Sequence, residues 1–333
     1  SNKMECFDGT KWWQVAVSSP DLNGGARGVF GGSYTYGASP ANYAKTNIID
    51  YITIATAGNA IDFGDLTETR GVTGAGASRT RGLFCGGDIN PSPLKTSNTV
   101  DYVTIATTGT CTNYGDLTEK GGHGIATMSN QTRLVCAGRN TQSPSDLDTI
   151  DYTTIATTGN FVDFGNLDQA EYGASGAGNA IRGIISQGDL GPAYENTIKY
   201  ITIPTLGNSQ DFGESSFSSS GAGALSSATR CLIGGGSGPS NLGNNIDYIT
   251  IATTGNSIRF GDLVVSQTRR FPGAVSNCIR GVWAGGYGVG PTYTVKNDID
   301  YVTIATEGDA VDFGDLTAGA AQHAGFSNGH GGL

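Results

Sequence analysis

Short apolar runs alternate with polar turns along the whole chain, and the pattern repeats about every fifty residues. The clearest copy is IDYITIATTGN at Ile246 to Asn256, whose β-branched and aromatic residues alternate with polar ones and predict a strand followed by a tight turn. A period of this length indicates repeated supersecondary units rather than separate domains. The central aspartate of the run recurs, with Lys199 at its fourth position, as Asp50, Asp101, Asp151, Asp247 and Asp300.

Two further phrases accompany each copy, and runs of tiny residues lie between the copies. An arginine opens a nearly continuous apolar run that usually ends in glycines, as in RGLFCGG from Arg81, and this predicts a strand buried on both faces. A DFGDL phrase, as at Asp62 to Leu66, predicts the next strand, with a glycine that bulges it or lets another backbone approach. Runs of tiny residues such as GAGAS at Gly74 to Ser78 suit an innermost strand, where space is least.

Four antiparallel strands per unit, narrowest at one edge, predict the blade of an all-β, six-bladed β-propeller. The first unit, from Arg27, lacks a tiny-residue strand before it, and one is left over at Ala318 to Phe326. We therefore expect this C-terminal strand to complete the N-terminal blade and close the ring. The final GHGGL is either a stop or the beginning of a seventh unit, and six blades is the preferred interpretation.

The predicted domain organisation is a propeller over residues 27–333 and an N-terminal extension over residues 1–26. The extension contains FDGTKWW, in which Asp8-Gly9 favours a hairpin turn. Trp12 and Trp13 either pack against the scaffold or form a docking surface, and packing is favoured because large aromatic side chains are usually buried.

Composition argues against several classes of function. The net charge of −10 repels phosphate backbones, so we expect no nucleic-acid partner. No apolar run approaches the length of a membrane span, so membrane insertion is not expected. The three histidines (His123, His323 and His330) and the six cysteines lack metal-ligand spacing, so neither a metal site nor a cofactor is predicted.

The order of features in each unit is similar to the kelch repeat. A diglycine is followed by a variable loop, a strand with a tyrosine, a turn and an aromatic residue, as in Gly86-Gly87, Tyr102 and Tyr114. Kelch units typically end in tryptophan, where this chain has Phe or Tyr. The wording IDYxTIATxGNxxDFGDL beside RGxxxGG resembles kelch-like modules of tail-fibre and other virion proteins of marine and cyanobacterial bacteriophages, and FDGTKWW resembles segments of phage fibres and adhesins. This resemblance covers about residues 27–326 and implies a virion location after synthesis in the host cytoplasm.

The repeated aspartates admit two interpretations. A ring of carboxylates would bind cations, but Lys199 in the fourth position argues against a closed ring. We expect instead that each aspartate caps a turn or pairs with an arginine of a neighbouring blade. The candidate partners are Arg81, Arg133, Arg182, Arg230 and Arg280.

Loops between the second and third strands of each unit differ in length and content, as do the loops that lead into the first strand, while the other turns are near-copies. In an antiparallel blade the two variable sets emerge on one face, as expected of a binding surface on a rigid scaffold, although drift in unconstrained loops explains them equally well. Tyrosine suits contacts with saccharides or proteins. The candidate ligand-binding residues are Tyr34, Tyr36, Tyr43, Tyr194, Tyr287, Tyr293, Arg269 and Arg270.

The sequence thus favours a non-catalytic virion binding module of the tail-fibre or adhesin type, with a host-surface glycan or protein receptor as partner. The alternative is a structural virion component that docks on capsid or tail proteins. A polysaccharide-active enzyme is less favoured, because most acids occupy repeated scaffold positions, although a pair of catalytic carboxylates is invisible in a sequence. Homo-oligomerisation is left open.

Overall fold

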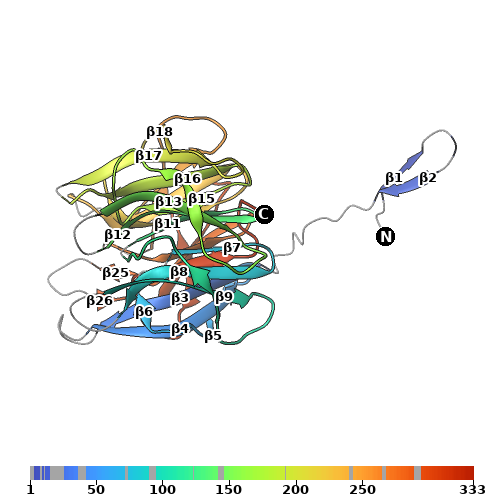
Figure 1. Ribbon diagram of the computed structural model, residues 1–333. Helices are drawn as coiled ribbons and strands as arrows, with labels where there is room; N and C mark the ends of the chain where they lie inside the picture. The colour runs from blue at the N-terminus through green and yellow to red at the C-terminus, as the bar shows by residue number, and fades with distance from the viewer. Residues whose placement is uncertain are drawn as a thin grey trace.

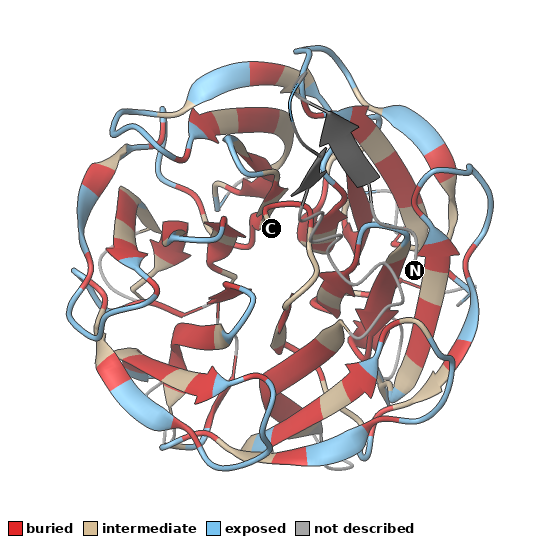
Figure 2. Ribbon diagram, turned by 90° about the vertical axis from the view of Figure 1, so that its right-hand side faces the viewer, coloured by how far each residue is buried: buried red, intermediate tan, exposed pale blue. Residues whose placement is uncertain are grey.

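The chain forms a six-bladed β-propeller, in which each blade is a four-stranded antiparallel sheet. Figure 2 looks down the axis of the ring, with the C-terminus at its centre, and Figure 1 shows the ring from the side. The computed structural model describes residues 4–7, 10, 12–15, 26–36, 43–71, 74–89, 95–122, 124–141, 146–191, 193–239, 243–264, 268–288 and 294–333. The predicted fold class is therefore confirmed.

Within a blade the strands run outward from the channel, and we call them a, b, c and d in that order. Blade 2 contains β7 (Gly74–Ala77), β8 (Arg81–Ile89), β9 (Lys95–Thr104) and β10 (Thr112–Asp116). Blade 3 contains β11 (Ala126–Ser129), β12 (Arg133–Asn140), β13 (Asp146–Thr154) and β14 (Val162–Asn166). Blade 4 contains β15 (Ser175–Gly178), β16 (Arg182–Asp189), β17 (Tyr194–Thr202) and β18 (Gln210–Glu214).

Blades 5 and 6 follow the same plan. Blade 5 contains β19 (Ser220–Ser226), β20 (Arg230–Ser237), β21 (Asn245–Thr250) and β22 (Ile258–Asp262). Blade 6 contains β23 (Gly273–Ser276), β24 (Arg280–Ala284), β27 (Asp298–Thr303) and β28 (Val311–Asp315). Two small additions are β6 (Arg70–Gly71), which pairs with β8, and the hairpin of β25 (Tyr287–Gly288) with β26 (Thr294–Val295).

Blade 1 joins the two ends of the ring, as the leftover C-terminal strand predicts. Its order is β29 (Ala324–Ser327), β3 (Arg27–Tyr36), β4 (Tyr43–Thr53) and β5 (Ile61–Asp65). The register places Ala324 opposite Gly31 and Ser327 opposite Gly28. This closure pairs strands more than 290 positions apart and leaves the ring without a free junction.

The N-terminal extension contains β1 (Met4–Phe7) and β2 (Trp12–Val15), which pair antiparallel with Phe7 opposite Trp12. The turn at Asp8-Gly9 and the side chains of Trp12 and Trp13 lie outside the described residues, so the choice between packing and docking stays a prediction.

The apolar core lies between neighbouring blades. At the first junction Val29, Ile49 and Phe63 of blade 1 pack with Phe84 and Ile105 of blade 2. Apolar side chains on both faces of each sheet are what a nearly continuous apolar strand predicts. Each blade is thus stabilised by its two neighbours.

The glycine of the DFG phrase permits close contact between blades. A Cβ at Gly64 would lie 2.4 Å from the carbonyl oxygen of Gly109, in the c-to-d turn of blade 2. The Gly109 N–H donates to the carbonyl of Phe63 at 2.7 Å, and Gly64 has a positive φ of 145° that favours glycine. Equivalent contacts follow around the ring, ending with Gly314 against Gly58.

The arginine that opens each b strand forms a second contact between blades. Arg81 stacks over the ring of Tyr102 in its own blade and donates to the carbonyls of Ile155 and Ala156 in blade 3. The last arginine, Arg280, donates to Ile54 and Ala55 of blade 1 and completes the circle. The other members of this ring are Arg27 with Tyr51, Arg133 with Tyr152, Arg182 with Tyr200 and Arg230 with Tyr248.

Candidate functional site

The two faces of the ring differ as the loop lengths predict. Segments that enter each a strand lie beside the end of a b strand, as the pairs Gly71 with Asp88, Gly122 with Asn140 and Tyr172 with Asp189 show. The b-to-c loops and the d-to-a segments therefore share one face, which we call the variable face. The a-to-b and c-to-d turns form the opposite, repetitive face.

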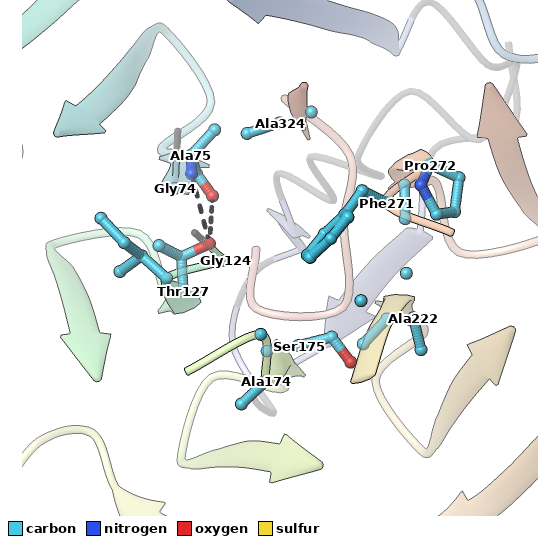
Figure 3. A pocket seen from close by; sticks show the side chains of 18 of the residues that line it. Gly74, Ala75, Gly124, Thr127, Ala174, Ser175, Ala222, Phe271, Pro272 and Ala324 are labelled. Atoms are coloured by element: carbon cyan, nitrogen blue, oxygen red, sulfur yellow. Dashed lines mark hydrogen bonds between the residues drawn. The ribbon is translucent and has the colours of Figure 1, made fainter. Parts of the chain in front are cut away.

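A cavity of about 80 Å³ occupies the variable-face end of the central channel. Figure 3 shows its lining: small residues of the a strands surround it, and the Phe271 ring projects toward its middle. Thr127 bridges two inner strands here, because its hydroxyl donates to the Ala75 carbonyl at 2.7 Å. Backbone groups and one aromatic side chain thus dominate the cavity.

A chain of backbone hydrogen bonds links neighbouring blades at this mouth. Each N–H donates to the carbonyl of the preceding blade, from Gly173 to Gly124 at 3.1 Å through to Gln322 to Phe271 at 3.2 Å. Gly124, Gly173 and Gly221 have positive φ there, which costs glycine little. Phe271 and Gln322 hold φ of 52° and 53° at the same position, where a side chain costs on the order of 1 kcal/mol.

The strain at Phe271 and Gln322 places two side chains at a position where blades 3, 4 and 5 carry glycine. Strained residues cluster at functional sites because the surrounding structure must maintain them. Neither residue is among the candidate residues predicted from the sequence. The available signal was the break in the small-residue pattern at RRFPG and AQHAG.

The repetitive-face end of the channel holds the C-terminal residues. The Nε2 atom of His330 lies 2.9 Å from the Ala77 carbonyl oxygen and 3.2 Å from the Ser129 hydroxyl. The Gly331 N–H donates to the Ser226 carbonyl. Burial lowers the pKa of His330 to about 4, so the imidazole is neutral near pH 7. The GHGGL segment therefore turns into the channel and adds no seventh blade.

The repeated aspartates cap the d strand of the preceding blade. Asp101 accepts from both the backbone N–H and the hydroxyl of Thr67, and Asp151 accepts from the same two groups of Thr118. Asp247 accepts instead from the Ser216 N–H. Turn capping, one of the two expected roles, is thus correct, and it operates across the blade junction.

The expected pairing of these aspartates with the b-strand arginines is wrong. Three aspartates form buried ion pairs with other arginines, which lie close enough because they reach inward from the variable face. These pairs are Asp101 with Arg70, Asp151 with Arg139 and Asp300 with Arg269. The predicted arginines Arg81, Arg133, Arg182, Arg230 and Arg280 instead stack on tyrosines and bind carbonyls.

Blade 4 carries the same contact with its charges exchanged. Lys199, in the aspartate position, pairs with Glu171 at 2.6 Å and with Asp168 at 3.1 Å. Glu171 takes the place of Arg70, and Asp168 takes the place of Thr67. Burial raises the pKa of Glu171, and the Lys199 ammonium opposes that shift. Lys199 is therefore a structural substitution, not a surface residue.

The predicted ligand-binding residues do not form one surface cluster. Tyr34 is buried, donates to Asp88 and lies under the Lys45 ammonium. Tyr287 is buried against Phe271, and Arg269 is fully buried beside Asp300. These three predictions are wrong as ligand contacts, because contacts within and between blades bury the side chains.

The other predicted residues have mixed positions. Tyr194 is half-buried at the start of β17. Arg270 stacks over Phe271 beside the channel mouth, and its guanidinium lies 3.4 Å from the Ser220 hydroxyl. Tyr293 and the side chains of Tyr36 and Tyr43 lie outside the described residues.

Comparison with known proteins assigns no family to the chain. No protein-family model matches it, and no curated protein matches it with significance. Within the described part of the chain, no helix has the length and apolar composition needed to cross a membrane.

Proposed function

We propose that this propeller is a non-catalytic binding module that recognises its partner through the variable face and the channel mouth. The supporting observation is the contrast between the two faces. Glycine turns and stacked arginines repeat at every junction as scaffold, and the capping aspartate recurs in five of the six blades. Phe271 and Gln322, in contrast, place side chains at the channel mouth where blades 3, 4 and 5 carry glycine.

The chemistry of the channel mouth also supports binding rather than catalysis. Its lining of glycine, alanine, Phe271 and Gln322 offers van der Waals surface and amide groups. A general acid or base needs a titratable group beside the reacting atoms. The titratable side chain in this lining is His323, whose pKa burial lowers to about 3.

The partner we propose is a host-surface glycan or receptor contacted by a phage particle. This part of the proposal depends on the resemblance of the IDYxTIATxGNxxDFGDL wording to virion modules. Because Tyr34 and Tyr287 are buried, the aromatic contacts proposed here come from Phe271 at the channel mouth and from the half-buried Tyr194.

Binding of the purified chain to candidate host cells and to an array of surface glycans tests the proposal. Phe271→Gly introduces the residue that blades 3, 4 and 5 carry here at a positive φ, so it removes the side chain without straining the backbone. A second variant shortens residues 37–42 and spares Tyr34. We expect either change to weaken binding at least tenfold. Ile181→Ser, on an exposed a-to-b turn of the repetitive face, is the matched control and should bind normally.

A structural virion role is the second candidate, and one observation favours it. Apolar side chains are exposed at the first d-strand position of four blades, on the rim of the repetitive face. They are Ile61, Val162, Ile258 and Val311. Docking replaces attachment as the function if two results are found together. Ile181→Ser or Ile258→Ser abolishes assembly with virion proteins, and the two variable-face variants bind host cells and glycans as wild type does.

A further inference from the structure

We propose that the junction between blade 6 and blade 1 binds a guanidinium group supplied by another molecule, with Asp50 as its counter-ion. This site shares the His323 side chain with the channel mouth but has its own cavity, and it does not depend on the proposed function. We compare this junction with blades 2, 3 and 6, where the chain itself supplies an arginine beside the equivalent aspartate. In blade 5, Asp247 instead accepts from the Ser216 N–H and the Ser257 hydroxyl.

Asp50 is prepared in the same way as the paired aspartates. Thr317 donates its N–H to Asp50 at 3.1 Å and its hydroxyl at 2.7 Å, and Thr67 donates to Asp101 at the same two distances. Asp101 also accepts from the Arg70 guanidinium at 3.0 Å. A carboxylate has about four acceptor positions, so the cap leaves Asp50 able to accept as Asp101 does.

Small residues stand at both positions from which other blades supply an arginine. Ala320 corresponds to Arg269, because its N–H and carbonyl bond the preceding blade in the same way. Ser33 corresponds to Arg139, because each follows the glycine bulge of its b strand. Both small side chains face the space that a guanidinium fills in blades 2, 3 and 6.

A cavity of about 30 Å³ occupies this space, with Ser33, Asp50, Ala320 and His323 in its lining. This volume holds about two waters, close to the size of a guanidinium head group. Phe30 and Ile48 also line it, and they correspond to Trp283 and Asp298, whose carbonyls accept from Arg269. The acceptors that surround Arg269 thus recur around the cavity.

His323 provides an independent sign of a ligand. Its side chain is 6% exposed, it lines the cavity, and neither ring nitrogen has a hydrogen-bond partner. A buried polar group without a partner costs about 1–3 kcal/mol, so it is usually satisfied by something bound. The neutral imidazole has one acceptor nitrogen, which suits an N–H donor such as guanidinium.

The guanidinium has to come from outside the chain's own folded ring. All twelve arginines lie in the described part, and none lines this cavity. Arginine also suits the site better than lysine, because a planar fork can contact a carboxylate and neighbouring carbonyls together. The ligand is therefore a free guanidinium compound or an arginine side chain of a partner.

Calorimetric titration of the full chain with N-acetylarginine amide, methylguanidinium and N-acetyllysine amide tests the site. We expect saturable binding of the two guanidinium compounds, at least tenfold tighter than the lysine compound. Tighter binding of the arginine amide than of methylguanidinium would identify an arginine side chain of a partner as the source of the guanidinium. Equal binding of the two compounds would identify a free guanidinium compound as the source.

Two variants locate the binding. Ala320→Arg supplies a tethered guanidinium and Asp50→Asn removes the counter-ion while keeping an acceptor for Thr317, and each should weaken binding at least tenfold. Asp62→Asn is the control, because this exposed acid faces Asp50 across the β4–β5 pair. The proposal is overturned if wild type shows no saturable binding, if lysine amide binds equally, if Asp62→Asn weakens binding as strongly, or if folded Ala320→Arg binds like wild type.

Discussion

Lys199 and Glu171 form a buried ion pair, with Nζ 2.6 Å from the carboxylate oxygen, at the position where blade 2 pairs Asp101 with Arg70. The two blades therefore use the same contact with opposite polarity. This exchange shows that, where the contact is an ion pair, complementary charges matter more than which member is the acid. Because the backbone of each blade follows the same course, the two positions face each other in both blades. A change of charge at one position is therefore matched by a change at the other.

Reversing one member of this pair should be strongly destabilising. Lys199→Asp places a third acid beside Glu171 and Asp168, and we expect it to lower the free energy of unfolding by about 3–5 kcal/mol. The triple variant Lys199→Asp, Glu171→Arg, Asp168→Thr copies blade 2 and should recover most of the loss. Urea unfolding followed by circular dichroism measures both. Equal instability of the single and triple variants would contradict the interpretation.

The glycine contact between blades has a matched pair of test positions. Gly165 and Gly207 have similar φ, 153° and 148°, but a Cβ at Gly165 would lie 2.5 Å from the Gly207 carbonyl oxygen, whereas one at Gly207 meets nothing within 4 Å. Both alanine variants carry the same backbone strain. Gly165→Ala should therefore be less stable than Gly207→Ala by about 1–3 kcal/mol in urea unfolding. Equal loss would show that conformation alone, and not blade contact, selects glycine.

The stacked arginines should contribute through geometry more than charge. Arg133 lies 4.8 Å from the Tyr152 ring centroid and donates to the Ile203 carbonyl of the next blade. Arg133→Lys keeps the charge but loses the planar fork, so we expect a loss of about 1 kcal/mol, and about 2 kcal/mol for Arg133→Ala. Arg79→Ala, at an exposed turn, is the control and should change the unfolding midpoint little. If Arg133→Lys matches wild type, charge suffices.

The repeat made the ring and its closure predictable from the sequence. The contacts that were not predicted involve residues that differ from one repeat to the next. Six copies of three phrases fixed the number of blades, and the leftover strand at Ala318 to Phe326 fixed the closure. Ion-pair partners were not predictable, because Arg139 reaches its aspartate from a b strand while Arg70 and Arg269 do so from d-to-a segments.

The candidate site was harder to predict for a related reason. Tyr34 and Tyr287 belong to variable segments, yet those segments pair with neighbouring strands and bury the rings. Phe271, Gln322 and His323 are single substitutions in runs of small residues. Phe271 and Gln322 stand out only at the mouth of the channel, and His323 only in the cavity beside Asp50. Both surroundings form only when the blades assemble.

Acid should destabilise the propeller through His323. Burial and, to a smaller extent, the nearby Arg269 charge lower the pKa of His323 from 6.5 to about 3. The unfolded chain therefore takes up a proton that the folded chain refuses, so stability present above about pH 6.5 is lost as pH falls toward 3. Between pH 7.5 and pH 5 this group alone should cost about 2 kcal/mol.

The variant His323→Phe separates this contribution from other titrating groups. Burial raises the pKa of Asp50 and Asp300, and such acids favour the folded chain as pH falls, so the wild-type profile contains opposing terms. The difference between wild type and variant cancels them. Urea unfolding at pH 7.5 and pH 5 should show that the variant loses about 2 kcal/mol less than wild type. His323→Gln keeps polarity without titrating in this range and should behave in the same way. Parallel profiles for all three proteins would contradict this prediction. They would mean that His323 takes up a proton in the folded chain as readily as in the unfolded chain.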